Sequence, residues 1–329
     1  MKTFLGRNHL EHGNRALAAF VVGAAVLSLA ALVGVAYAAG FGAVWRELRG
    51  IHPWWLLAAL AGEIVAYLGY IVAYREVARV ERGPRIPAGD AAALVSTGFG
   101  PFVMQGGFAV DLHAFRDYGV SDREARVRVL GLGALEYAML APAACIASIL
   151  LLAEGVPHPT VGITLPWALA VPVGFAAALM AVEHRRRFRN RGGWREAIAQ
   201  ALDSIHVLRL LFVRTRHVAG PVGTAVYWFG DIFCLWACLH AFQASPPGIA
   251  QLVVGYATGY ALTRRTLPFA GAGAVEALLP FALAWTGFSL AAALLAVVGY
   301  RIFNLWLPVV PAAASHSSCR GWRRSSLSA

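Results

Sequence analysis

The chain has 329 residues, of which 59% are hydrophobic and only 14% charged, and its formal net charge is +11. This composition is too apolar for a soluble domain of this length and predicts a helical protein that crosses a membrane several times. The basic residues flank apolar segments and form no nucleic-acid-binding motif, so nucleic acid is not an expected partner.

Six apolar segments approach the length of about 20 helical residues that crosses a bilayer core. They are residues 16–39, 53–74, 129–152, 166–182, 217–242 and 288–313. The first resembles a secretory signal peptide, but its length and the lack of a convincing cleavage site favour a retained helix. The expected fold is all-α and polytopic, with one transmembrane domain over residues 16–313.

Arginines mark the side of the membrane that we expect to be cytoplasmic. They lie before the first span and in residues 75–85, 116–128, 183–218 and 320–324. Because loops rich in positive charge stay in the cytoplasm, residues 1–15 and 314–329 are predicted to be cytoplasmic tails. The expected location is the cell (cytoplasmic) membrane.

The longest polar segment, residues 183–218, contains an apolar stripe at helical spacing. Its members are Ala197, Ala201, Leu202, Ile205, Leu208 and Leu211. The stripe predicts an amphipathic helix on the membrane surface, and a solvated connector helix is the alternative.

Residues 90–111 are apolar but broken by Pro101, Gly106 and Gly107. Each half is too short to span, and arginine-rich sequence lies on both sides. A segment that starts and ends on one side of the membrane with a break in its middle is predicted to be a re-entrant hairpin. The alternative is one irregular span.

Residues 249–285 form a second broken segment, with Pro268 and two glycines in its middle. The order of sides predicts that it enters from the opposite face of the membrane. Both segments read Pro-Phe, then a glycine pair, then Ala-Val and a carboxylate, which is Asp111 in the first and Glu276 in the second. The pattern is what an inverted repeat would give, with two hairpin tips that meet near the bilayer midplane, and a chance match of two short segments is the alternative.

Glu276 follows Gly271 and Gly273 inside this apolar sequence. If a half-helix begins here, its N-terminus and the glycine amides favour an anion such as phosphate. Glu276 is expected either to cap this helix or to pair with a nearby arginine.

Three arginines are candidates for that pairing and for substrate binding, namely Arg264, Arg265 and Arg301. Arg301 lies near the middle of the last predicted span, about 20 Å from either end at the rise of a helix. Charge inside hydrocarbon is costly and usually faces a cavity or a partner. Arginine also binds phosphate in a bidentate way. We therefore expect these residues to contact an anionic group such as phosphate.

Other charged residues within apolar sequence have two interpretations. Asp111 and Arg116 lie at the exit of the first hairpin and either contact the substrate or mark the membrane interface. The lone carboxylates Glu63, Glu136 and Asp231 are each expected to face the interior with a partner.

Signatures of enzymes are missing from the sequence. We find no His-Glu-x-x-His, Walker or Gly-x-Ser-x-Gly motif. Cys234 and Cys238 share a helix face but lack further ligands, so they are expected to pack rather than to bind metal. No catalytic residue, metal or cofactor is expected.

The motifs together resemble the lysylphosphatidylglycerol synthase transmembrane (flippase-like) family. Gly271-Ala-Gly-Ala-Val-Glu276 resembles its glycine-rich segment, and Tyr300-Arg301-x4-Trp306-x-Pro308 resembles its final helix. Gly106-Gly107-Phe-Ala-Val-Asp111 resembles its first conserved block. The chain departs from the family at Phe269-Ala270, where Pro-Gly is usual, and at His113, where an arginine is usual.

The resemblance implies movement of a phospholipid or related amphiphile between leaflets. The soluble synthase domain of some relatives does not follow the last span, so aminoacyl transfer to lipid is not expected. Membrane phospholipids are the expected partners. The alternatives are a non-catalytic partner of an envelope-lipid enzyme and a membrane-embedded enzyme that acts on a lipid-linked substrate.

Overall fold

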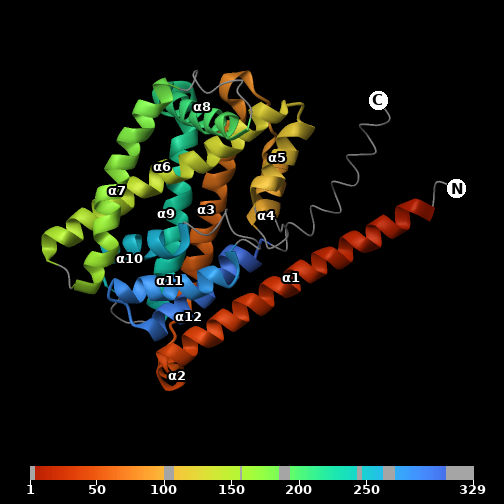
Figure 1. The fold of residues 1–329 in the computed structure, drawn as a ribbon. Coiled ribbons are helices and arrows are strands. Elements are labelled where there is room, and N and C mark those ends of the chain that lie inside the picture. The colour runs from red at the N-terminus through yellow and green to blue at the C-terminus, as the bar shows by residue number, and fades with distance from the viewer. Residues whose placement is uncertain are drawn as a thin grey trace.

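The computed structural model describes residues 4–99, 107–155, 158–184, 193–242, 247–261 and 271–308. Every regular element in these ranges is helical (Figure 1). The α-helices are α1 Phe4–Ala39, α2 Phe41–Arg49, α3 Trp54–Arg79, α4 Ala88–Phe99, α5 Gly107–Asp117, α6 Asp122–Glu154, α7 His158–Glu183, α8 Gly193–Val213, α9 Ala219–Phe242, α10 Ile249–Tyr256, α11 Ala274–Trp285 and α12 Leu290–Arg301. Two π-helical segments, Ala257–Ala261 and Ile302–Trp306, continue α10 and α12.

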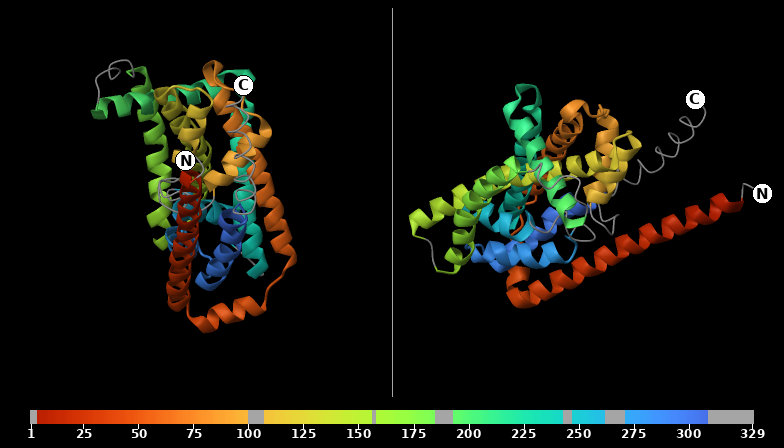
Figure 2. Two further views of the ribbon diagram at one scale, coloured as in Figure 1. Left: turned by 90° about the vertical axis from the view of Figure 1, so that its right-hand side faces the viewer. Right: turned by 45° about the horizontal axis from the view of Figure 1, so that its top comes forward.

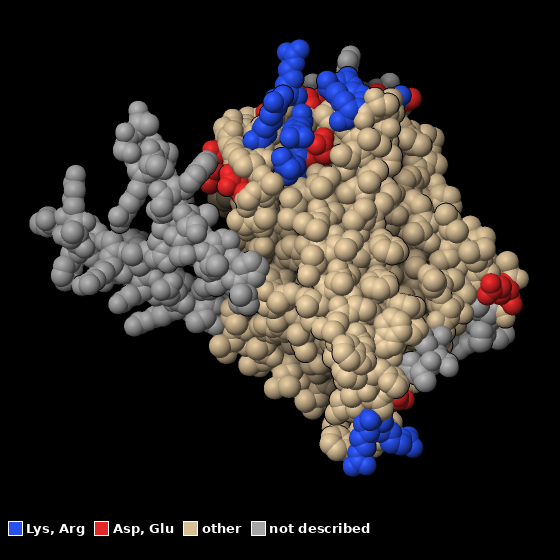
Figure 3. Space-filling model, turned by 180° about the vertical axis from the view of Figure 1, so that it is seen from behind, with Lys and Arg blue, Asp and Glu red and all other residues tan. Residues whose placement is uncertain are grey.

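Five of the six predicted spans are helices that are long and apolar enough to cross a membrane. They are Val21–Ala39, Trp54–Arg82, Asp122–Glu154, Thr160–Glu183 and Thr215–Phe242. The sixth forms the shorter apolar helix Leu290–Trp306. In the face that Figure 3 shows, most of the surface between two basic ends carries no charged side chain. The prediction of an all-α, polytopic membrane protein is confirmed.

Helices α3 and α9 pack against each other along much of their length, in opposite directions. Glycines allow this close approach. A Cβ atom at Gly69 would lie 2.6 Å from the carbonyl oxygen of Gly223, and one at Gly230 would lie 2.5 Å from that of Gly62. Small residues let helix backbones meet in this way inside membranes. The contact fixes the carboxylates that follow two of these glycines, Glu63 on α3 and Asp231 on α9.

Two pairs of short helices correspond to the predicted hairpins. Helix α4 packs on α5, and α10 packs on α11. The two pairs lie in opposite halves of the bundle (Figure 1). At 12 residues or fewer, each helix is too short to span a membrane alone.

Several residues at the predicted breaks lie outside the described part of the chain. These are Pro101, Gly106, Arg264, Arg265 and Pro268. Gly107 is the first residue of α5. The re-entrant path of each pair and the meeting of the tips therefore stay predictions.

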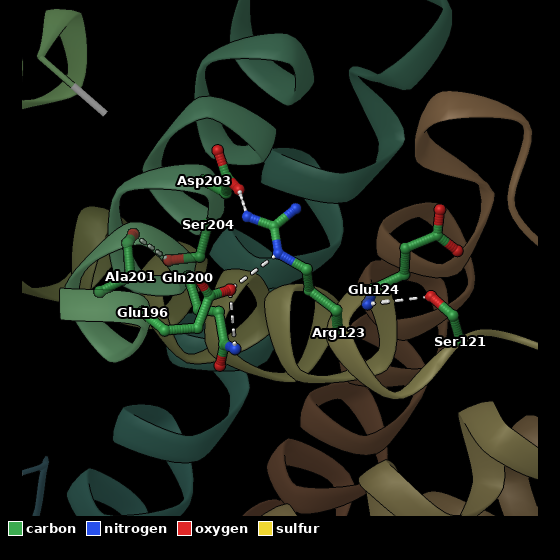
Figure 4. A network of polar contacts seen from close by, with 8 residues as sticks. All are labelled: Ser121, Arg123, Glu124, Glu196, Gln200, Ala201, Asp203 and Ser204. Atoms are coloured by element: carbon green, nitrogen blue, oxygen red, sulfur yellow. Dashed lines mark hydrogen bonds and ion pairs between the residues drawn. The ribbon is translucent and has the colours of Figure 1, made fainter. Parts of the chain in front are cut away.

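Helix α8 lies within residues 183–218, where the sequence predicts a helix, and most of the predicted stripe lies on its inner side. Leu202 and Leu211 of the stripe are buried and Ile205 and Leu208 are half-buried, whereas Ala197 and Ala201 are exposed. The helix packs on α6, where Arg123 donates to Glu196 at 3.0 Å and to Asp203 at 2.7 Å (Figure 4). These two contacts join α8 to α6, and the position of α8 on the membrane surface stays a prediction.

Helix α1 lies against α11 and α12 with its C-terminal half, while its N-terminal half points away from the other helices (Figures 1 and 2). Ala24 belongs to a small apolar cluster with Ala272 and Leu305. The first predicted span is thus part of the same helix bundle as the candidate site.

Candidate functional site

The glycine break before α11 places Glu276 at a helix N-terminus. Gly271 and Gly273 adopt φ values of 72° and 84°, in the left-handed region where glycine avoids the cost of a side chain. Helix α11 starts at Ala274, and the Oε2 atom of Glu276 accepts a hydrogen bond of 2.7 Å from the Gly273 backbone N–H. A negative charge at this position is stabilised by the helix dipole.

The same carboxylate forms a buried ion pair with Arg301. The Nε atom of Arg301 lies 2.8 Å from Oε1 of Glu276, and the side chains are 3% and 1% exposed. The hydroxyl of Ser28 on α1 donates to the same oxygen at 2.8 Å. Capping and pairing, which the sequence offered as alternatives, therefore occur together. Glu276 joins α1, α11 and α12.

A second polar cluster lies beside the first and centres on Asp231. Tyr256 and Tyr300 donate hydrogen bonds to its Oδ2 atom. The amide of Asn304 donates to Oδ1 of Asp231 at 2.7 Å and to Oε1 of Glu63 at 3.3 Å. Tyr300, Arg301 and Asn304 share one helical stretch, so α12 connects the two clusters.

The π-helical segments contribute to this convergence. Arg301 ends the α-helical part of α12, and Asn304 lies in the π-helical part that follows. Tyr260, in the other π-helical segment, donates to the Oδ1 atom of Asn304 at 2.7 Å. Irregular turns of this kind inside helices are frequent at functional sites. Here they bring side chains of α10 and α12 to one point.

Glu136, on α6, is also buried and has a partner. Its Oε1 atom accepts a hydrogen bond of 2.8 Å from the hydroxyl of Tyr70 on α3. The expectation that the lone carboxylates Glu63, Glu136 and Asp231 face the interior with partners is confirmed.

Two predicted site residues lie elsewhere. Asp111 is buried on α5, where it interacts with Tyr74 of α3 and Glu136 of α6. Arg116 forms an ion pair of 2.7 Å with Asp122 at the start of α6, and both side chains reach solvent. Of the predicted residues that are described, the structure thus brings together Glu276, Arg301, Gly271 and Gly273.

The sequence analysis did not select Ser28, Asn304, Tyr256 or Tyr260, and it named Tyr300 only as part of a family motif and not as a site residue. A signal existed for two of them, because Tyr300 and Asn304 lie within one helical turn of Arg301. Ser28 had none beyond being a hydroxyl within an apolar span. Hydroxyl and amide groups often join helices in membranes by hydrogen bonds.

Among the described residues, no group of three or more His, Cys, Asp or Glu side chains comes close enough to bind a metal ion. What the geometry offers instead is a cation, Arg301, held by a carboxylate at the N-terminus of a helix. An anion that replaced this carboxylate would find both the guanidinium and the backbone amide.

Comparison with known proteins supports the resemblance seen in the motifs. No curated protein matches the chain. The family described as "Lysylphosphatidylglycerol synthase TM region" matches residues 17–312, which include every described residue of both polar clusters. The chain therefore belongs to the lysylphosphatidylglycerol synthase transmembrane-region family.

Proposed function

We propose that the protein translocates an anionic phospholipid or related amphiphile between the leaflets of the membrane. Its family associates it with lipid metabolism or transport. The observation that carries the proposal is the buried ion pair of Glu276 and Arg301 beside a break in a helix. Charged residues within a membrane are costly, and those that occur there usually face the interior and mark the path of a substrate or ion.

The proposed step is an exchange of partners at Arg301. A phosphate group approaches the N-terminus of α11, accepts hydrogen bonds from the guanidinium, and displaces Glu276. The acyl chains stay in lipid while the head group passes along a polar groove between the broken helix pairs. Short helices that end at membrane depth are the usual way in which transporters build such a site.

We further propose that both termini lie in the cytoplasm, because the arginine-rich segments do so under the positive-inside rule. In our proposal the site residues bind the head group and do not act as acid, base or nucleophile. No covalent step is assigned to them. Two alternative functions remain, a supporting role for an envelope-lipid enzyme and catalysis on a lipid-linked substrate. The following experiment distinguishes them.

The test is lipid scrambling in proteoliposomes with head-group-labelled lipids and a membrane-impermeant quencher. Purified protein should expose inner-leaflet label to the quencher, and Glu276→Gln should abolish this exposure. Glu154→Gln is the matched control, because Glu154 is exposed at the end of α6. Its activity should equal that of the unchanged protein.

The other outcomes decide between the alternatives. Equal scrambling by Glu276→Gln and Glu154→Gln would remove the proposed site. No scrambling of any anionic or zwitterionic lipid, with ion gradients supplied, would favour the supporting role. A labelled lipid of altered mass would favour catalysis. Thermal unfolding of each variant in detergent checks that a loss of activity is not a loss of fold.

A further inference from the structure

A cationic cavity lies at the end of α3, apart from the clusters described above. It has a volume of about 530 Å³, within the range of about 300–1,000 Å³ that is usual for small-molecule sites. Its lining residues are Glu76, Arg79, Arg82, Gly83, Arg85, Arg216 and His217. Glu63 contacts the central network thirteen residues earlier on α3, which is about 20 Å at the rise of a helix.

The cavity has four arginines and one carboxylate, and that carboxylate is already engaged. Arg79 lies 2.7 Å from Oε1 of Glu76, and Nδ1 of His217 lies 3.4 Å from Oε2. Arg216 donates through Nε to Nε2 of His217 at 3.0 Å. This contact places the imidazole proton on Nδ1, directed at Glu76. Glu76 therefore orients Arg79 and His217 and leaves the rest of the positive charge uncompensated.

The remaining arginine donors have no protein acceptor in the described part of the chain. The Nε atom of Arg79 is buried there without a hydrogen-bond partner. Arg82 and Arg85 form no ion pair with any described residue. Guanidinium groups that converge on a cavity in this way match the oxygen atoms of a phosphate group.

The turn that carries these arginines is held in place before any ligand binds. Arg128 of α6 donates to the carbonyl oxygens of Ala78 and Val80 at 3.4 and 3.2 Å. Arg75 donates to the carbonyl of Ile86 at 3.0 Å. A Cβ atom at Gly83 would lie 2.0 Å from the Ala78 carbonyl oxygen, so the turn is packed too closely here for any side chain. A preformed site loses less free energy to ordering when a ligand binds.

The backbone of the turn is unusual as well. Glu81 and Arg82 have φ values of 53° and 63°, which few residues other than glycine adopt. Such conformations persist where the surroundings enforce them, often at ligand sites. Arg82, which has this backbone conformation, is one of the residues that line the cavity.

We propose that this cavity binds a phosphate-bearing group, either the head group of an anionic lipid or a soluble phosphate compound. The site is distinct from the Glu276 pair and does not depend on lipid translocation. Its position at the arginine-rich end of α3 gives access both to lipid head groups and to the aqueous phase. Both sources present the same chemistry, a charged phosphate, to the same arginines.

The experiment measures binding by the purified full chain. Calorimetry in detergent uses inorganic pyrophosphate as the soluble probe. Nanodiscs that contain phosphatidylglycerol, against nanodiscs of phosphatidylcholine alone, test the lipid source through the shift in thermal unfolding. The test variants are Arg85→Gln and the double variant Arg82→Gln/Arg85→Gln. The matched control is Arg46→Gln/Arg49→Gln, which removes two exposed arginines of α2.

We expect the double variant to bind at least about tenfold more weakly, with a smaller loss for Arg85→Gln and no change for the control. If the test variants bind pyrophosphate more weakly than the control does, the site is assigned to soluble phosphates. If only their response to phosphatidylglycerol is smaller, the site is assigned to lipid. Binding that is absent for both probes, or that is equal in the test and control variants, overturns the proposal. Because Arg82 and Arg85 are exposed, unfolding without ligand should not change, and scrambling activity reports separately on the proposed function.

Discussion

Glu276 and Asp231 are two buried carboxylates whose charges are satisfied in different ways. Glu276 has a cation, Arg301, together with the Gly273 amide and the Ser28 hydroxyl. Asp231 accepts hydrogen bonds from the uncharged groups of Tyr256, Tyr300 and Asn304, and it shares a further one with the carboxyl group of Glu63. A single helix, α12, supplies donors to both.

This difference predicts different roles. A carboxylate that shares a cation can be replaced by another anion, because the cation keeps a partner throughout the exchange. A carboxylate held by hydroxyl and amide groups has no such substitute, and its donors would be left without an acceptor. We therefore expect the Glu276 region to respond to a ligand and the Asp231 region to hold α3, α9, α10 and α12 together.

The largest expected effect is that of Arg301→Met, which removes the cation and leaves Glu276 buried. Breaking a buried ion pair by removing one partner costs about 3–5 kcal/mol of folding free energy. The double variant Arg301→Met/Glu276→Leu should regain most of this stability, because neither charge remains. Both variants should be inactive in scrambling. Chemical unfolding in detergent and the proteoliposome assay measure the two quantities.

The control for this variant is Arg116→Met, which breaks the solvent-exposed pair with Asp122. Exposed ion pairs contribute about 0–1 kcal/mol, so the change in stability should be small. If the double variant were as unstable as Arg301→Met, the loss would come from the packing of Arg301 and not from its charge. If the double variant scrambled lipid, Arg301 would have no part in transport.

A smaller effect is expected from Asp231→Asn. The new amide group presents a donor to hydroxyls that need an acceptor, and an unsatisfied buried group costs about 1–3 kcal/mol. Scrambling should persist in the folded fraction, in contrast to Glu276→Gln. Asp90→Asn is the control, since Asp90 also accepts a hydrogen bond from a tyrosine, Tyr118, but is only partly buried. Complete loss of transport in a folded Asp231→Asn protein would contradict the division of roles.

The sequence predicted the membrane spans and the pairing of Glu276, because both follow from the high free energy of placing a charged group in hydrocarbon. The spans followed from apolar length, and the partner of Glu276 had to be one of a few arginines. The rest depended on contacts between distant residues. Ser28 and Glu276 are 248 positions apart, and Glu63 and Asn304 are 241 apart. Burying a hydroxyl or amide group within an apolar span costs much less free energy than burying a charge. The sequence therefore does not indicate which residue such a group will contact.

The apolar stripe of α8 was predicted only in part, because Leu202 and Leu211 are buried whereas Ala197 and Ala201 are exposed. Its apolar residues lie on two overlapping faces, and periodicity alone does not choose between them. Contacts with another helix contribute to the choice, among them those of Arg123 on α6 with Glu196 and Asp203. The pattern of one helix specifies that it has a buried face, whereas its neighbours specify which face that is.

The smallest effect is expected from Ser28→Ala, which removes one of the three donors to Glu276 and leaves the ion pair intact. Hydrogen bonds between membrane helices contribute about 0.6 kcal/mol on average and up to about 1.7 kcal/mol. The matched control is Ser204→Ala, because the buried Ser204 hydroxyl donates only to the carbonyl of Ala201 in its own helix (Figure 4). A stability loss in Ser28→Ala that exceeds the control, with scrambling retained, would show that α1 is held to the site by this contact. Equal stability in the two variants would mean that packing alone holds α1, and that Glu276 is satisfied by Arg301 and the backbone of Gly273.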